Sequence, residues 1–234
     1  MHTKRHAFIL TTYAKQIKAL NDLIHECKIL LLNNDLSLIR FGGGTALAIY
    51  HFQHRKSFDI DVFVTDPQLL NYLSPKHWLE DSPLFNTVKY IDLTNHIRLL
   101  TKKNIKIDIL VAQDFLGNPI VDSSKAFFHE DIYIESLEDI LAKKIVYRKE
   151  QNKSRDIIDL GVALFHDPFI FEKLLQSEAV TLQDLHDLNT ALTKLDIQRY
   201  LDEIDLVEPV DYYVEVAKKA PTSIQAALKK HEAK

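Results

Sequence analysis

Two aspartates, Asp59 and Asp61, stand one residue apart in the apolar run FDIDVFV. Alternate residues of a β-strand point to the same face, so both carboxylates are expected on one side of a strand while Ile60 and Val62 enter the core. Carboxylates that point together repel each other unless a cation joins them. Their oxygens suit Mg²⁺, which proteins often bind together with nucleotide phosphates. The pair therefore predicts a metal site.

Three of the five glycines in the chain are consecutive, at positions 42–44. They follow a strand-like apolar run and precede a helix-like one at 46–50. Glycines at such a turn let backbone N–H groups approach a phosphate, and the N-terminus of the helix favours an anion. A glycine turn alone is usually only flexible, and a D-x-D pair alone is usually an exposed strand edge. Their order and spacing together favour a nucleotide site, with Gly43, Gly44 and Thr45 as phosphate-binding residues.

A third acid is expected from Asp108, which interrupts the apolar series Ile105, Ile107 and Ile109. A buried carboxylate without a partner is costly, so its strand is predicted to lie beside the pair of aspartates described above. Asp92 is the competing candidate for the third acid. It ranks second because it adjoins a hairpin turn, where aspartate is common for local reasons.

Two stretches of this sequence resemble the AbiEii/AbiGii toxin family of nucleotidyltransferases, which belongs to the polymerase-β-like superfamily. The first stretch is Gly43-Gly44-Thr45-Ala46-Leu47 followed by His54-Arg55-x-Ser57-x-Asp59-Ile60-Asp61-x-Phe63. The second is Lys144 followed by Arg155-Asp156-x-x-Asp159-Leu160. One departure is Gln151, which stands where the family often has a further arginine; Arg148 lies one helical turn earlier.

The resemblance implies an enzyme that moves NMP from an NTP to an acceptor hydroxyl with two Mg²⁺ ions, or with Mn²⁺ in their place. It implies Asp59, Asp61 and Asp108 as metal ligands, with Lys144 and Asp156 completing the catalytic set. A triphosphate carries more charge than two Mg²⁺ neutralise, so further cations are expected around it; for the basic residues of the second stretch, a solvated helix face is the alternative. The expected phosphate contacts are Gly43, Gly44, Thr45, Arg55, Ser57, Lys144, Arg148 and Arg155.

The resemblance also implies a toxin of a bacterial toxin–antitoxin or abortive-infection system. RNA, in particular a tRNA-like acceptor end, is then the expected acceptor, and a cognate antitoxin protein is an expected partner. The residues themselves leave open a protein or small-molecule acceptor. They also leave open a non-catalytic module that uses the same fold to bind nucleotide or a partner.

Composition sets the broad class of the protein. With 46% hydrophobic and 26% charged residues in 234, the chain can build a large core. Its net charge of −4 excludes a global basic field, so nucleic acid would need a local basic patch. The single Cys27 excludes an internal disulfide framework and is typical of a reducing compartment. No apolar run reaches the length of a membrane span, so a soluble, cytoplasmic protein without membrane contact is expected.

The hydrophobic periodicity predicts an α/β (α+β) protein. A nucleotidyltransferase domain with a mixed sheet is expected over residues 1–134, and an all-α helical bundle over 135–234. The first domain is predicted to contain a helix at 6–33, strands at 36–41 and 58–64, a helix at 67–74 and a three-stranded meander from residue 87. In the second domain, after a helix that opens at Ser136, helices are expected at 168–177, 181–193, 196–203, 209–219 and 222–232.

Overall fold

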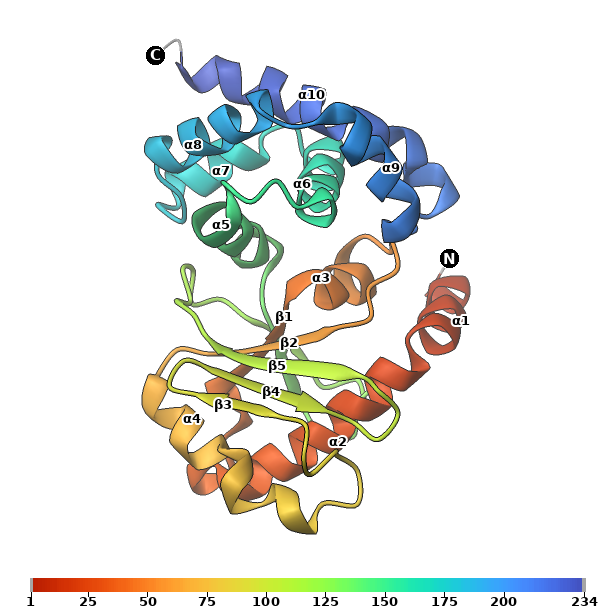
Figure 1. Cartoon of the computed structure of the whole chain (residues 1–234), viewed down its shortest axis with the longest axis vertical. Coiled ribbons are helices and arrows are strands. Elements are labelled where there is room, and N and C mark those ends of the chain that lie inside the picture. The colour runs from red at the N-terminus through yellow and green to blue at the C-terminus, as the bar shows by residue number, and fades with distance from the viewer. Residues whose placement is uncertain (1, 233–234) are drawn as a thin grey trace. The chain divides into compact units, whose positions relative to one another are not determined.

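The computed structural model of the chain describes residues 2–232 (Figure 1). The chain is α/β, as predicted, and its contacts divide it into two compact units. Unit 1 comprises the chain up to Ile49, Phe58–Asp114 and Asn118–Glu135. Unit 2 comprises Tyr50–Ser57, Phe115–Gly117 and the chain from Ser136 onward. The division of the sequence into domains at 134/135 stays a prediction.

A single mixed sheet forms the centre of unit 1, with the strand order β3-β4-β5-β2-β1-β7-β6. Two pairs of neighbours, β2 with β5 and β1 with β7, run parallel, and the other pairs run antiparallel. The predicted meander is confirmed, because β3, β4 and β5 are consecutive antiparallel neighbours. The strands are β1 (Ile39–Gly42), β2 (Ile60–Val64), β3 (Ile91–Leu93), β4 (His96–Leu100), β5 (Lys106–Val111), β6 (Ile120–Asp122) and β7 (Ile132–Ile134).

One face of this sheet carries the core. Ile60, Val62 and Val64 of β2 are almost fully buried, whereas the residues between them are only half-buried. The helices α2 (Ala14–Leu30) and α4 (Pro67–Leu73) lie on the core side (Figure 1). Helix α4 begins where its sequence predicts, because the Asp66 carboxylate accepts a hydrogen bond from the backbone N–H of residue 68 at 2.8 Å.

The prediction of one continuous helix over 6–33 is wrong. The structure has α1 (His2–Thr12) and α2, separated at Tyr13, where the backbone leaves the helical region (φ −111°, ψ 15°). The Tyr13 side chain is fully buried. Both flanking segments keep their apolar spacing through the break, so periodicity alone did not reveal it.

The strand–turn–helix order around the glycines is confirmed. β1 leads directly into α3 (Gly43–Ala46), which continues as a π-helical turn over Leu47–His51. The strand is shorter than predicted at its start, because Leu36–Leu38 form a 3₁₀ turn. In that turn the Asp35 carboxylate accepts a hydrogen bond from the Ser37 backbone N–H at 2.9 Å.

Unit 2 is built from helices. The predicted cap at Ser136 is present, since its hydroxyl accepts a hydrogen bond from the Asp139 backbone N–H at 3.2 Å. Thr181 and Asp184 form a full capping box. The helices are α5 (Leu137–Arg148), α6 (Ser154–His166), α7 (Ile170–Gln176), α8 (Leu182–Thr193), α9 (Ile197–Val207) and α10 (Val214–Glu232).

The two helices predicted at 209–219 and 222–232 are instead largely one helix, α10, which runs through Pro221. Proline inside a helix removes a hydrogen bond and usually breaks or kinks it. Here α10 packs closely on α6: a Cβ added at Gly161 would lie only 2.4 Å from the Ala220 Cβ. This packing helps to stabilise the helix beside the proline.

Within residues 2–232, no helix combines the length and the apolar character that crossing a bilayer requires.

Candidate active site

The candidate active site is a row of residues that crosses four neighbouring strands of unit 1. Asp61 of β2 lies opposite Asp108 of β5. On the outer sides of this pair, Arg98 of β4 lies opposite Asp108, and Gly42 of β1 lies opposite Asp61. Paired residues on neighbouring strands share one face of the sheet. Both carboxylates therefore stand on the face away from the core.

Asp59 joins this row through a lysine. It lies one residue before β2, and its Oδ2 is 2.6 Å from the Nζ of Lys106 at the start of β5. The same Nζ is 3.8 Å from Asp108 Oδ2. The structure thus brings Asp59, Asp61 and Asp108 to the same end and face of the sheet, as the sequence predicts.

Two basic side chains of β4 hold Asp108. Arg98 donates from Nε to Oδ1 at 2.6 Å and from Nη2 to Oδ2 at 3.2 Å, and His96 Nε2 lies 2.9 Å from Oδ1. Burial by itself would raise the pKa of the Asp108 carboxyl, but the bonds from Arg98 and His96 outweigh it and lower that pKa. Asp108 is therefore ionised at neutral pH.

The glycine turn lies directly against Asp61. Gly43 has a φ of +68°, and a Cβ at this position would lie 2.1 Å from Asp61 Oδ2. Glycine is needed here for two reasons, the backbone conformation and the approach of the carboxylate. Thr45, which is fully buried, donates its hydroxyl hydrogen to the backbone carbonyl of Asp59. The turn is thereby fixed to the segment that carries the acids.

Sequence reasoning missed a fourth carboxylate on this face. A Cβ at Gly42 would lie 2.0 Å from Oε2 of Glu135, which is 97% buried, and 2.8 Å from a ring carbon of Phe63. Glu135 directly follows β7, and its backbone N–H donates to the Phe41 carbonyl at 3.0 Å. Nothing in the local pattern around residue 135 indicated this position, because it depends on the parallel pairing of β7 with β1.

Asp92 lies elsewhere. Its carboxylate accepts a hydrogen bond from Ser74 Oγ at 2.9 Å and pairs with Lys76 Nζ at 2.8 Å. On the sheet it is opposite Ile97, a fully buried residue of the core face. Asp92 is therefore on the other face of the sheet from Asp61.

The remaining predicted site residues belong to unit 2, where several form a buried cluster of charges. Arg55 donates to both oxygens of Asp159, from Nε at 2.7 Å and from Nη2 at 2.9 Å. Lys144 Nζ lies 2.5 Å from Asp156 Oδ1 and 2.8 Å from Asp159 Oδ2. His54 Nε2 lies 2.6 Å from Asp159 Oδ1. Each of these five residues is at least 94% buried.

Electrostatics keep this buried cluster ionised at its carboxylates and neutral at its histidine. Burial would raise the pKa of Asp159, but the charges of Arg55 and Lys144 hold that pKa well below its usual range. Asp156 follows the same logic, and its pKa is lowered by Lys144 and Arg148 against the effect of burial. For His54, burial outweighs the bond to Asp159, and its pKa is lowered.

Basic residues gather between α5 and the start of α6. Arg148 Nη1 is 3.5 Å from Asp156 Oδ2. The side chain of Lys153 is exposed, and its pKa is lowered by partial burial first and by the positive charges of Arg148 and Arg155 second. Lys153 was not among the predicted phosphate contacts. Ser57, which was, is half-buried at the end of the Tyr50–Ser57 segment.

Whether the acids fit a metal depends on their present partners. Among the described residues, no three or more His, Cys, Asp or Glu side chains are arranged so that they could hold a metal ion. The donor chemistry of Asp59, Asp61 and Asp108 suits Mg²⁺. In this structure, Asp59 and Asp108 bond to Lys106 and Arg98, so a bound ion would have to displace these cations for the carboxylates to face it together.

Solved structures from Helicobacter pylori share this fold. One, solved as a candidate nucleotidyltransferase, aligns with a TM-score of 0.51 at 18% identity and covers 92% of this chain and 94% of its own. The other, JHP933, has a TM-score of 0.50 at 18% identity, with 92% and 91% covered. The nucleotidyltransferase toxin MenT4 from Mycobacterium tuberculosis H37Rv aligns at a TM-score of 0.46 and 12% identity, with 96% and 89% covered.

No protein with a curated description matched the sequence. A family model did match, over residues 30–226, and its description reads "Nucleotidyl transferase AbiEii toxin, Type IV TA system". The matched range includes the glycine turn, the carboxylate row and the buried cluster of unit 2. The chain therefore belongs to the AbiEii nucleotidyl transferase toxin family.

Proposed function

We propose that this protein is a metal-dependent nucleotidyltransferase that moves NMP from an NTP to a hydroxyl of RNA, in particular a tRNA-like acceptor end. We further propose that it acts as the toxin of a toxin–antitoxin or abortive-infection system. The observation that carries the proposal is the contact between Asp61 and Gly43, which sets a row of carboxylates against a turn suited to phosphate.

In this proposal Asp59, Asp61 and Asp108 would hold Mg²⁺ or Mn²⁺. The bound ions would neutralise phosphate charge and favour ionisation of the attacking hydroxyl. The acceptor oxygen forms a bond to the α-phosphorus, the bond from that phosphorus to the bridging oxygen breaks, and pyrophosphate leaves. Backbone N–H groups of Gly43 and Gly44 would contact the β- and γ-phosphates. Lys106 and Arg98 would give up their present contacts with Asp59 and Asp108 as the metal ions and the NTP bind.

The basic residues of unit 2 have separate proposed roles. Arg148 and Arg155 would contact the triphosphate. An anion bound there would offset their positive charges, which, after burial, lower the pKa of Lys153. Lys144 and Asp156 complete the catalytic set as a bonded pair. Arg55 bonds to both oxygens of Asp159, so in this structure its first effect is to position the segment that precedes Ser57.

Labelled nucleotide tests the proposal. Wild-type protein, Mg²⁺ and each of the four α-labelled NTPs are incubated with cellular RNA, and incorporation is measured. Asp61→Asn should reduce incorporation by about 10²–10³-fold, because one of the proposed ligands of the metal that stabilises charge on the reacting phosphate is removed. Asp92→Asn is the matched control, since it makes the same change on the other face of the sheet, away from the site, and it should leave the rate within about two-fold.

Absence of label in RNA, protein and small acceptors with all four NTPs would contradict transfer. The alternative, a non-catalytic nucleotide-binding module, is favoured by the partners that Asp59 and Asp108 already have in Lys106 and Arg98. Calorimetry separates the two functions. A binding module would bind NTP without transferring nucleotide, whereas an enzyme would both bind NTP and transfer nucleotide.

A further inference from the structure

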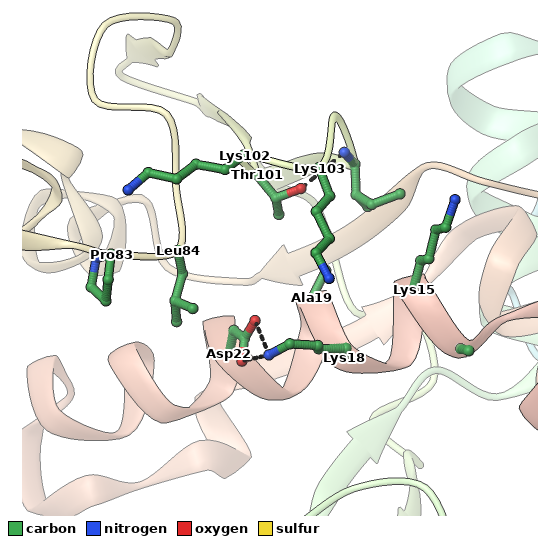
Figure 2. A pocket seen from close by; sticks show the side chains of 11 residues that line it. Lys15, Lys18, Ala19, Asp22, Pro83, Leu84, Thr101, Lys102 and Lys103 are labelled. Atoms are coloured by element: carbon green, nitrogen blue, oxygen red, sulfur yellow. Dashed lines mark hydrogen bonds and ion pairs between the residues drawn. The ribbon is translucent and has the colours of Figure 1, made fainter.

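A second feature of unit 1 is a groove of about 500 Å³ between α2 and the turn that joins β4 to β5 (Figure 2). Lys15 and Lys18 rise from the helix on one side, and Lys102 and Lys103 extend from the turn on the other. We call the groove that these four lysines line the lysine groove. Its volume lies within the range of ligand-binding sites in proteins.

The charge of the lysine groove is not balanced locally. Lys18 pairs with Asp22 at 3.0 Å. Lys15, Lys102 and Lys103 are exposed and have no carboxylate within ion-pair distance among the described residues. The whole chain has a net charge of −4, so this concentration of positive charge is a local feature. A groove of this kind attracts a polyanion.

Between the lysines the lining is apolar. It includes Ala19, Pro83, Leu84 and Ile105, and neither an arginine nor an aromatic ring is part of it. Arginine forks and planar amides are the groups that read base edges, and they are absent from this lining. The chemistry therefore fits contact with a phosphate backbone, with sugar or base surfaces against the apolar part, and it does not fit recognition of a particular base sequence.

The lysine groove lies on the α2 side of the sheet, and two segments of the chain connect it with the carboxylate row at the end where β2 and β5 begin. Ile105 of the groove immediately precedes Lys106, whose Nζ is 2.6 Å from Asp59 Oδ2. On the helix side, Gln16 follows Lys15, and its Nε2 donates to the Phe58 carbonyl at 3.5 Å. Phe58, which directly precedes Asp59, has a side chain that is 51% exposed. An aromatic ring in this position can stack on an unpaired base.

We propose that the lysine groove binds the backbone of a single-stranded RNA segment next to the acceptor end, with Phe58 stacking on a base between the groove and the acids. This inference rests on the proposed function, because it takes RNA as the acceptor. Continuity with the carboxylate row favours RNA over an acidic peptide. Binding here is independent of base sequence and depends strongly on salt.

Fluorescence anisotropy of a labelled single-stranded RNA of mixed sequence, titrated with the full chain and without NTP, tests the groove directly. The double variant Lys102→Glu/Lys103→Glu should weaken binding by about ten-fold or more. The slope of log K against log salt should fall by about 1.4, since each phosphate contact of a single strand contributes about 0.7. Phe58→Ala should weaken binding without changing this slope.

The matched control is Lys229→Glu/Lys230→Glu, which makes the same charge change at two exposed lysines of α10. It should leave RNA affinity within about two-fold if the groove, and not net charge, governs binding. An equal loss in both double variants, or no loss in the groove variant, would overturn the proposal. So would displacement of the RNA from the groove by a leucine-containing poly-glutamate peptide that binds more tightly than RNA does.

The experiments distinguish failure of the groove proposal from failure of the proposed function. If wild type transfers nucleotide to RNA but the groove variant binds and transfers equally well, the groove inference fails and the proposed function stands. If wild type binds RNA through the groove but transfers nothing, the proposed function fails while the RNA site stands. Asp61→Asn should bind RNA as tightly as wild type, which separates RNA binding from chemistry.

Discussion

The carboxylate row of unit 1 and the buried cluster of unit 2 contain the same kinds of residue in opposite settings. In the row, the side chains of Lys106 and Asp59 are 32% and 36% exposed, whereas that of Asp108 is only 8% exposed. In the cluster, His54 and Asp159 are fully buried. Exposed ion pairs contribute little and can exchange partners. Buried pairs are expensive to break, because the remaining charge has no water around it.

This difference teaches which motif residues are available to a ligand. Asp59 can release Lys106 at small cost, because both side chains reach solvent. The cost of releasing Asp159 from its buried cations is much larger. The family motif contains residues of the row and residues of the buried cluster alike. Only the burial seen in the structure distinguishes the two sets.

The largest expected effect comes from Asp159→Asn. Arg55 and Lys144 would keep their charges in the interior with one carboxylate fewer, so unit 2 should lose about 3 kcal/mol or more of unfolding free energy. Urea unfolding followed by circular dichroism measures the helices, and fluorescence follows Trp78, the only tryptophan, which belongs to unit 1. An unchanged helical transition would show that the buried cluster does not stabilise unit 2.

Gly43→Ala should have the next largest effect. The new residue would adopt a positive φ, which costs about 1–2 kcal/mol, and its Cβ would meet the Asp61 carboxylate. Gly117→Ala is the matched control, because Gly117 has a φ of +63° and no atom within 4 Å of an added Cβ. Both variants should lose stability, but only Gly43→Ala should also lose nucleotide transfer. Equal activity in the two would argue against the contact with Asp61.

Asp59→Asn tests the exposed side of the comparison. Lys106 would lose this partner at a position that solvent reaches, so the Trp78 transition should shift by about 1 kcal/mol or less. This cost is expected to be a fraction of that of Asp159→Asn. Comparable losses in the two variants would remove the distinction between the row and the buried cluster. Nucleotide transfer should fall strongly in Asp59→Asn despite the small change in stability.

The last prediction concerns pH and His54. Burial lowers the pKa of His54 in the folded chain below its ordinary value of 6.5, so the unfolded chain binds more protons just below that pH. Stability therefore falls as the pH drops from 7 toward 5, with a limiting slope of about 1.4 kcal/mol per pH unit for one proton. His54→Gln should reduce this slope in thermal melts. A slope identical to that of wild type would exclude His54 as its source.

Local patterns predicted the parts of the site that depend on neighbours in sequence. The alternation around Asp61 and the glycines before α3 gave the strand, the turn and the face of the carboxylates. The position of Arg98 opposite Asp108 depends on strand register, which single-sequence patterns do not specify. The Arg55–Asp159 bond joins residues 104 positions apart. Only the fold brings such residues together, so Arg55 was predicted as a phosphate contact and not as a partner of Asp159.

The assignment of Tyr50–Ser57 to unit 2 has a consequence for the chain as a whole. This short segment contains His54 and Arg55, and the chain re-enters unit 1 at Phe58, immediately before Asp59. A fragment beginning at Ser136 would keep Asp159 but lack the two residues that bind it, so no single cut yields two self-sufficient pieces. The helices of unit 2 therefore depend for their assembly on a stretch of polypeptide that lies directly before Asp59, so a substitution in this stretch is expected to affect both units.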